Sequence, residues 1–409
     1  MSWRKEAVST VRRVPKPLYA NFSAAELADR CDRARAAMDK RGIDLLLLTA
    51  RENVVYFTGL ASMAWVQKGV VPAVVLIDKA TPEPIMVLPD FWLGTAEKTT
   101  WVNDFVLHHN SHSHPTDFAN LLAATIKQRG WSRSRIGYEA GTETLIGMPL
   151  DQWDHLRAEL STADWVDGSD VVWGVRMIKS PAEIERLRHS AVATNRAQEQ
   201  LRDHARAGMD ELELGAYLRR AMMQNDASEQ DRIFLNMRAG TERYSMTDTY
   251  PEDRRLQPGD MLVVDAGFML EGYASDTARV MSVGKPSALY TSIYERVVEA
   301  RSKALEELSA GVPAHAIYKA VRSVYDKAGL PAHIDMVGHG IGLDVHEPPM
   351  LSPDNPTLLE ENMVVCIEPW ITLPDDQGVL TIEDTFRVKV GGWEELTLPN
   401  ASTLWVIPT

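Results

Sequence analysis

Cysteine is scarce in this chain: only Cys31 and Cys366 are present among 409 residues. Two cysteines so far apart do not form the disulfide framework of a small secreted protein, and neither has a zinc-finger spacing. Cys366 stands within VVCIEP, where we expect it to pack as a small apolar side chain. The cysteine content therefore excludes a disulfide scaffold as the basis of the fold.

Long apolar runs and excess positive charge are also missing. No run approaches the ~18 apolar residues that a membrane-spanning helix needs. The N-terminus, MSWRKEAVSTVRRVPKP, is basic but contains no apolar segment of signal-peptide length. The 43 Lys and Arg residues are outnumbered by 57 Asp and Glu, and the formal charge of −14 argues against nucleic acid or anionic membrane as a partner. We expect a cytoplasmic protein that acts on a small molecule or a short peptide.

The length of the chain fits two domains rather than one. We place the boundary near residue 175, which gives a first domain of residues 1–175 and a second domain of residues 176–409. A strong helix start follows this boundary: Ser180 can cap the helix, Pro181 suits its first turn, and Glu183 stands at the capping-box position.

The order of apolar and amphipathic segments differs between the two domains. In the first domain it predicts alternating elements and an α/β fold, with strands at 43–50, 70–78, 83–89 and 134–140, and helices at 23–40 and 117–130. In the second domain helices stand between groups of strands, which predicts an α+β fold. Its expected elements are a long helix that begins at Pro181, helices at 210–224, 286–309 and 314–328, strands in RIFLNM, MLVVDAGFM and TARVMSV, and strands after Met363.

Four carboxylates and one imidazole stand out in the second domain because each lies within or beside an apolar, strand-like run. They are Asp265, Asp276, His339, Glu368 and Glu383. Four carboxylates cannot be buried close together unless cations neutralise them. Carboxylate and imidazole ligands suit two divalent ions that share bridging oxygens. The set therefore predicts a dinuclear metal centre and an enzyme.

Each of these residues also has an ordinary structural interpretation. Asp265 could cap a turn and Asp276 could be a solvated hairpin residue, although two strands joined at Glu271-Gly272 would bring both carboxylates to one point. His339 in GHGIG could be a loop residue. His346, seven residues later, favours a polar pocket instead.

At these motifs the chain resembles the pita-bread metallohydrolases, the superfamily of methionine aminopeptidases, Xaa-Pro aminopeptidases, prolidases and creatinases. VVDAGFMLEGYASDTAR resembles the aspartate pair of the family, GHGIGLDVHEPP its histidine motif, and IEP and IEDT its two glutamates. ENVVYFTG in the first domain and RMIKSPAEI at the junction resemble creatinase and prolidase. The likeness thus covers nearly the whole chain, and all five ligand types recur in order.

The resemblance implies a role for each residue. Asp265 would chelate one ion and His339 the other, whereas Asp276 and Glu383 would bridge both. Glu368 would hold the second ion and shuttle protons, and His346 would donate a hydrogen bond to the substrate carbonyl. The two divalent ions could be Mn, Zn, Co or Fe, because oxygen-rich sites accept several metals. The resemblance also implies a homodimer in which the first domain of one subunit contributes to the active site of its neighbour.

Two departures from the family pattern concern the substrate. Peptidases of the group carry another His where this chain has NMRAGTERYSMTDTY, and Met246 stands about where that His is expected; Tyr244 could substitute in part. Trp370 follows Glu368-Pro369 where the family usually has Gly, and it could narrow the pocket, stack on a flat or cationic group, or simply pack under the strand. We therefore assign Tyr244, Met246 and Trp370 to the substrate side of the site.

We expect a metallohydrolase that cleaves a C–N bond in an Xaa-Pro-type peptide or a small amide. One alternative is a metal-dependent lyase on the same fold, similar to those that cleave dimethylsulfoniopropionate. Another is a non-catalytic binding module, although such modules usually lose metal ligands and this chain retains them all. The histidine-rich HHNSHSH (108–114) is expected to be a solvated loop.

Overall fold

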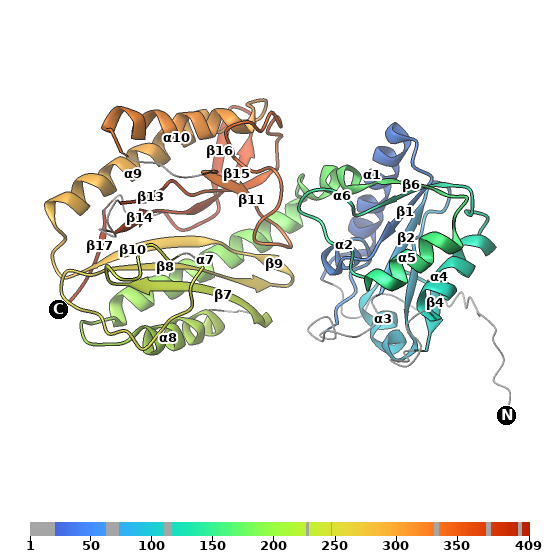
Figure 1. The fold of residues 1–409 in the computed structure, drawn as a ribbon, viewed down its shortest axis with the longest axis horizontal. Helices are drawn as coiled ribbons and strands as arrows, with labels where there is room; N and C mark the ends of the chain where they lie inside the picture. Colours follow the sequence, from blue (N-terminus) through green and yellow to red (C-terminus); the bar gives the residue numbers. More distant parts are fainter. Residues whose placement is uncertain are drawn as a thin grey trace. The chain divides into compact units, whose positions relative to one another are not determined.

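The computed structural model describes residues 21–62, 73–109, 117–225, 229–246, 248–330, 335–373, 378–399 and 403–409. It divides into two compact units, Met1–Arg176 and Met177–Thr409 (Figure 1). The first 20 residues and most of the histidine-rich loop fall outside the described residues. Among the described helices, none is both long and apolar enough to cross a membrane.

The first unit is a six-stranded sheet with helices, in the strand order β4-β3-β2-β1-β5-β6. Its strands are β1 (Leu45–Leu48), β2 (Val74–Asp78), β3 (Ile85–Pro89), β4 (Asp104–His108), β5 (Arg135–Tyr138) and β6 (Asp164–Asp167). Its helices are α1 (Ala24–Arg41), α2 (Arg51–Thr58), the short 3-10 turn η2 (Asp90–Trp92), α3 (Leu93–Thr99), α4 (Asp117–Gln128), α5 (Leu150–Glu159) and α6 (Ser169–Arg176). This arrangement confirms the predicted α/β class.

Local sequence explains how the first unit is built. The Ser23 hydroxyl accepts a hydrogen bond from the Glu26 amide at the start of α1, and Gly42 ends the helix in the left-handed conformation. The four leucines of β1 are buried on both faces, as expected for an inner strand. Strands β4 and β6 were not predicted, because DFVLH and DWVD are short and carry a charged residue at one or both ends.

The described residues of the second unit form two larger sheets and four helices. The helices are α7 (Pro181–His204), α8 (Glu211–Gln224), α9 (Ala288–Glu307) and α10 (Ala314–Ala328). One sheet has the order β17-β10-β8-β7 with β9 beside β8, built from β7 (Glu229–Ala239), β8 (Met261–Leu270), β9 (Tyr273–Ala274), β10 (Thr277–Val283) and β17 (Trp405–Ile407). The other has the order β11-β12-β15-β16, built from β11 (Gly338–Gly340), β12 (Val364–Ile367), β15 (Asp384–Lys389) and β16 (Gly392–Glu395). β13 (Trp370–Thr372) pairs with β14 (Val379–Thr381).

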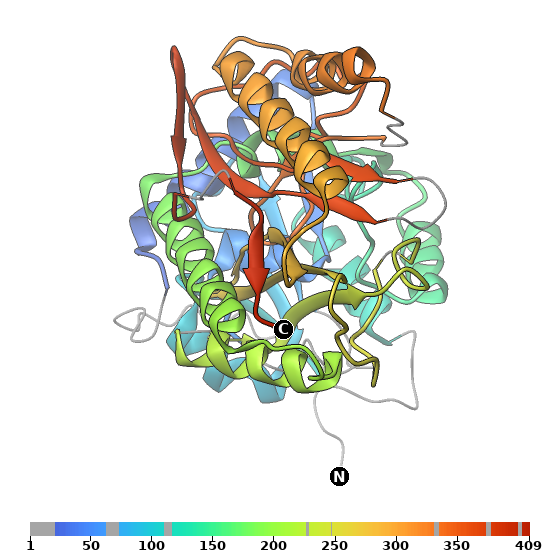
Figure 2. The same ribbon diagram turned by 90° about the vertical axis from the view of Figure 1, so that its left-hand side faces the viewer.

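The strands of the second unit lie between two pairs of helices. In both views α7 and α8 lie on one side of the strands, and α9 and α10 lie on the other (Figure 1 and Figure 2). Each side has its own hydrophobic core. Leu262, Val264 and Ala266 of β8 belong to the core with α7 and α8, whereas Met261 and Val263 belong to the core with α9 and α10. This two-sided α+β architecture is the predicted fold class.

A helix cap and a turn that the sequence predicts are both observed in the second unit. The Ser180 hydroxyl and the Glu183 carboxylate form a complete capping box at the start of α7. Glu271 and Gly272 both have positive φ angles, which is typical of the tight turn between β8 and β9. Asn362 also has a positive φ, of 73°, which asparagine tolerates.

Candidate metal centre

The alternation of side chains along β8 and β10 positions the two aspartates. Asp265 lies opposite Ala278 in the antiparallel pair of β8 and β10, and Asp276 stands just before β10. Asp265 lies two residues after Val263 and four after Met261, so its side chain is on the same face of β8 as theirs. This face is opposite α7 and α8. The hairpin predicted from the spacing of the two aspartates is therefore present.

His339 lies in β11 and is fully buried. Its Nδ1 lies 3.0 Å from the Gly340 carbonyl oxygen, to which it can donate a proton, and this leaves the Nε2 lone pair available. Nε2 is 3.5 Å from Asp276 Oδ2, 3.6 Å from Glu368 Oε1 and 3.7 Å from Glu383 Oε1. Residue 340 has to be glycine, since a Cβ there would come within 2.3 Å of the Pro348 carbonyl oxygen.

The two glutamates reach the same point from the ends of strands. Glu368 follows β12, and Glu383 lies between β14 and β15. The chain leaves the β13–β14 pair at Thr381 and joins the other sheet at Asp384, so Glu383 lies in the short connection between the two sheets. Residues distant in the sequence are thus brought to one buried cluster.

The donor atoms of this cluster fit divalent ions. Within this cluster, five buried atoms have no hydrogen-bond partner among the described residues: Asp265 Oδ1, Asp276 Oδ1, His339 Nε2, Glu368 Oε1 and Glu383 Oε1. Buried polar atoms are normally paired, so five together indicate a missing cationic partner. Four oxygens and one imidazole nitrogen are the ligands that Mn²⁺, Zn²⁺, Co²⁺ and Fe²⁺ accept.

The donors form overlapping groups rather than a single one. Asp265, Asp276 and Glu383 each place an oxygen within 4.8 Å of the others. A second group of equal size contains Asp276, His339 and His346, and a third contains His339, Cys366 and Glu383. Asp276, His339 and Glu383 each belong to two groups. Of these three, only the carboxylates of Asp276 and Glu383 have two oxygens with which to bridge two ions.

Without cations, burial changes the protonation of the cluster. Burial and then the neighbouring carboxylates raise the pKa of Asp276 and Glu383 well above their usual range, and burial raises the pKa of Glu368 to about 7. Burial acts to lower the pKa of His339, but the carboxylates of Glu383 and Glu368 raise it to about 9. The cluster thus holds protons where divalent ions would supply the compensating charge.

Cys366 is close to the cluster but has the character of a thiol rather than a thiolate ligand. Burial raises its pKa well above the ordinary value, and the nearby carboxylate of Glu383 raises it further. Its sulfur lies 3.5 Å from the Thr385 hydroxyl. This environment agrees with the apolar packing expected from VVCIEP.

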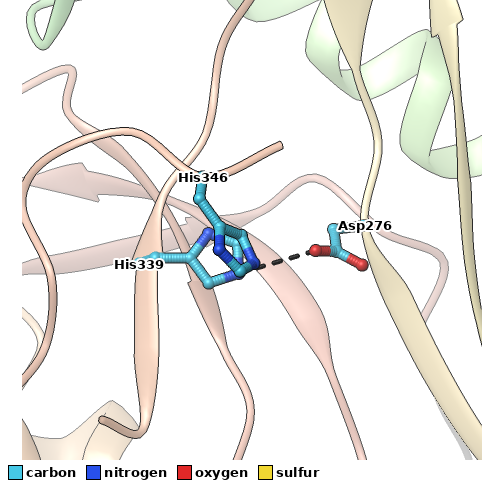
Figure 3. A group of neighbouring side chains, drawn as sticks. All are labelled: Asp276, His339 and His346. Carbon is cyan, nitrogen blue, oxygen red and sulfur yellow. Dashed lines mark ion pairs between the residues drawn. The ribbon is translucent and has the colours of Figure 1, made fainter. Parts of the chain in front are cut away.

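His346 lies at the exposed edge of the cluster. Its ring centroid is 4.0 Å from that of His339, and both rings lie across from Asp276 (Figure 3). Partial burial of the ring and then the charge of His339 lower the pKa of His346 to about 4. The next residue, Glu347, fixes the loop: it accepts a hydrogen bond of 2.8 Å from the Leu343 amide. His346 can thus face a molecule entering from solvent.

The three residues assigned to the substrate side have different environments. Tyr244 is only 2% exposed and packs in the core with α9 and α10, and its hydroxyl accepts a 2.6 Å hydrogen bond from the Met261 amide. Burial raises its pKa. This placement gives Tyr244 a packing role. Met246 is 42% exposed and Trp370 is half-buried, so both keep surface that a ligand could contact.

Two polar residues of β7 border the cluster and were not singled out from the sequence. The Asn236 amide nitrogen donates to Asp265 Oδ2 over 3.3 Å, and Arg238 Nη1 donates to Asn236 Oδ1 over 2.8 Å. The available signal was the spacing i, i+2 of two polar residues within the apolar run RIFLNMRA, which places both on one face of a strand.

Both units of the chain match known protein families. Residues 185–389 match metallopeptidase family M24, and residues 30–178 match the Creatinase/Prolidase N-terminal domain. The chain is 27% identical over 361 residues to an Xaa-Pro dipeptidase of Pyrococcus horikoshii, which covers 88% of this chain and 94% of that protein.

Solved structures show the same architecture along nearly the whole chain. An Xaa-Pro dipeptidase from Bacillus anthracis superposes with a TM-score of 0.81 at 26% identity, covering 93% of this chain and 100% of that one. Dipeptidase PepE from Mycobacterium ulcerans gives a TM-score of 0.81 at 26% identity, covering 95% and 100%. The M24 match spans half of the chain and includes all five donor residues, and the chain therefore belongs to metallopeptidase family M24, a family of metal-dependent peptide hydrolases.

Proposed function

We propose that this protein is a dinuclear metallohydrolase that cleaves the C–N bond of a short peptide or a small amide. The observation that carries the proposal is the convergence of five buried donor atoms that have no hydrogen-bond partner among the described residues. The overlap of the donor groups at Asp276 and Glu383 supports two adjacent ions rather than one. Mn, Zn, Co and Fe all suit such ligands.

Each of the five residues would have its own role as a ligand at such a centre. Asp265 would hold one ion, and His339 with Glu368 the other. Asp276 and Glu383 would bridge them, since each lies in more than one donor group and a carboxylate offers one oxygen to each ion. Two divalent ions bound here supply Lewis acidity and an activated water near neutral pH.

Glu368 and His346 carry out the steps that depend on protein groups. The Glu368 side chain is 19% exposed, whereas Asp276 and Glu383 are buried. Its carboxyl can take a proton from the attacking water and pass it to the leaving nitrogen. His346 lies at the exposed edge of the cluster, where its ring N–H can donate to the substrate carbonyl as negative charge develops on that oxygen.

The names of the relatives support a C–N bond as the target, because several are Xaa-Pro dipeptidases. Met246 stands about where peptidases of the group carry a His, and for this reason we include small amides in the substrate range. The match of residues 30–178 to the Creatinase/Prolidase N-terminal domain supports a homodimer whose first domain contributes to the neighbouring site. The two free, buried cysteines are compatible with the cytoplasm.

A substrate assay tests the proposal. Purified protein should be loaded separately with Mn²⁺, Zn²⁺, Co²⁺ and Fe²⁺ and given Xaa-Pro dipeptides, small amides and dimethylsulfoniopropionate. Hydrolysis of a dipeptide or amide, lost on chelation, is the expected result. Release of dimethyl sulfide without hydrolysis would identify a lyase instead, and metal-independent turnover would contradict the dinuclear mechanism. Light scattering in solution tests the homodimer.

A further inference from the structure

Arg238 is a buried guanidinium without an ion pair. It is 0% exposed, and within the described residues no carboxylate lies at ion-pair distance from it. One edge is occupied, because Nη1 donates to Asn236 Oδ1. The other edge, made of Nε and Nη2, has no hydrogen-bond partner. Burial lowers the pKa of the guanidinium, and the carboxylates of Asp265 and Asp248 oppose this shift from beyond ion-pair distance. They leave the Nε–Nη2 edge without an acceptor, and such an unsatisfied buried edge requires an explanation.

Other buried arginines of the same unit are paired. Arg279 forms an ion pair with Asp384, and Arg243 forms one with Glu211 over 3.1 Å. In each of these two, Nε alone lacks a hydrogen bond, whereas Arg238 also lacks one at Nη2. The fold thus provides carboxylates for its structural arginines and leaves a two-donor edge of Arg238 without an acceptor.

The position of Arg238 connects it to the metal cluster. Residues 236 and 238 lie on the face of β7 opposite Leu235, Met237 and Ala239, which pack in the core with α7 and α8. This is the face on which Asn236 donates to Asp265. Two hydrogen bonds, from Arg238 to Asn236 and from Asn236 to Asp265, therefore separate the guanidinium from a proposed metal ligand.

Trp370 covers the guanidinium on the side of the second sheet. The Arg238 Cζ lies 5.3 Å from the centroid of the indole ring, which gives a cation–π contact. Trp370 is half-buried, and its indole N–H donates to the Thr372 hydroxyl over 3.2 Å at the exposed side. A rotamer change of such a side chain on ligand binding is ordinary, and it would open the Nε–Nη2 edge to a ligand.

Two parallel N–H groups on one edge of a guanidinium match the two oxygens of a carboxylate. We propose that Arg238 binds the carboxylate of the substrate through Nε and Nη2, next to the C–N bond that is cleaved, and so selects acidic substrates such as dipeptides with a free C-terminus. This inference rests on the proposed hydrolase function. Asn236 is the positioning residue that holds the guanidinium beside the metal cluster, and Trp370 forms the opposite wall of the carboxylate subsite.

A pair of substrates that differ only in this carboxylate tests the inference: glycyl-L-proline and glycyl-L-prolinamide, with the metal-loaded full chain. We expect the wild type to prefer the acid. Arg238→Met should raise KM for the acid on the order of 100-fold, as expected for truncating one partner of a buried charge pair. The change in kcat for the acid, and the changes in KM and kcat for the amide, should be far smaller. Arg238→Lys keeps the charge but not the planar fork, so its KM for the acid should lie between those of the wild type and Arg238→Met.

Two outcomes would overturn the inference. One is a wild type without preference for the acid. The other is an Arg238→Met variant that loses activity on both substrates equally, with weaker metal binding and the same behaviour in Asn236→Ala; Arg238 would then act only through Asn236 on Asp265.

A binding measurement separates this failure from failure of the proposed function. Calorimetric titration with N-acetyl-L-proline and N-acetyl-L-prolinamide requires no turnover. If the wild type hydrolyses neither dipeptide substrate but binds the acid more tightly than the amide, and Arg238→Met removes the difference, the hydrolase assignment fails and the carboxylate subsite stands. Equal binding of acid and amide by the wild type would refute the subsite.

Discussion

The ammonium group of Lys179 lies 3.3 Å from a carboxylate oxygen of Glu347, and both side chains are almost fully buried. The other Glu347 oxygen accepts hydrogen bonds from the amides of Leu343 and Asp344. A residue at the start of the second unit thus holds the loop that carries His346.

Lys179→Met should therefore destabilise the protein and impair the His346 loop. Removing one partner of a buried ion pair leaves the other charge uncompensated, which costs about 3–5 kcal/mol. Urea denaturation of the second unit and kcat with the best substrate would measure the two effects. The matched control is Arg186→Met, which removes the more exposed pair with Glu271 and should cost about 1 kcal/mol or less. Equal stability losses in the two variants would contradict the account.

Asp276→Asn and Glu383→Gln should abolish turnover while the fold persists. Both changes keep the size of the side chain and remove the charge that two ions share. The activity loss should exceed the roughly 10–100-fold that follows loss of an outer-shell partner. Steady-state kinetics measure the loss of turnover, and circular dichroism shows whether the fold persists. Either variant would refute the bridging role if it retained near wild-type kcat with a normal metal content.

His346→Gln should lower kcat about 100- to 1000-fold and leave the metal content unchanged, because His346 is assigned to the substrate carbonyl rather than to an ion. The control is His315→Gln, since the ring of His315 in α10 hydrogen-bonds to the Asn355 carbonyl, in a segment without proposed site residues. A fall in metal content that matched the fall in kcat would reassign His346 as a ligand, and unchanged kcat would remove it from the mechanism.

His108 should make the first unit sensitive to acid. It is buried at the end of β4 beside Phe118, and burial lowers its pKa to about 4 from an ordinary value of 6.5. The unfolded chain therefore binds a proton below about pH 6.5 that the folded chain excludes until about pH 4, so stability falls as the pH falls through this window.

His108→Gln should flatten this pH dependence, whereas the partly exposed His155→Gln in the same unit should not. Urea midpoints between pH 7.5 and 4.5 measure the difference. Parallel profiles for the wild type and His108→Gln would show that burial of the imidazole has no effect on stability.

The sequence pointed to the residues of the buried carboxylate–histidine cluster because their chemistry is expressed locally. Each carboxylate interrupts or ends an apolar run, so its burial and its need for a cation could be inferred without knowing the fold. The strands of the first unit with long apolar runs, such as Leu45–Leu48, were predicted for the same reason.

What the sequence did not predict depends on pairing between distant segments. Arg238 has no special neighbour in the chain; only the register of β7 against β8 places Asn236 beside Asp265 and Arg238 next to it. Tyr244 was assigned to the substrate because it lies near Met246 in sequence. Its orientation into the core depends on the hydrogen bond from Met261, 17 residues away.

The metal content of the protein tests the central claim most directly. After reconstitution with Mn²⁺ and dialysis, elemental analysis by inductively coupled plasma mass spectrometry should find close to two ions per wild-type chain and fewer in Asp276→Asn. A fully active wild-type protein with one ion or none per chain would contradict the dinuclear centre.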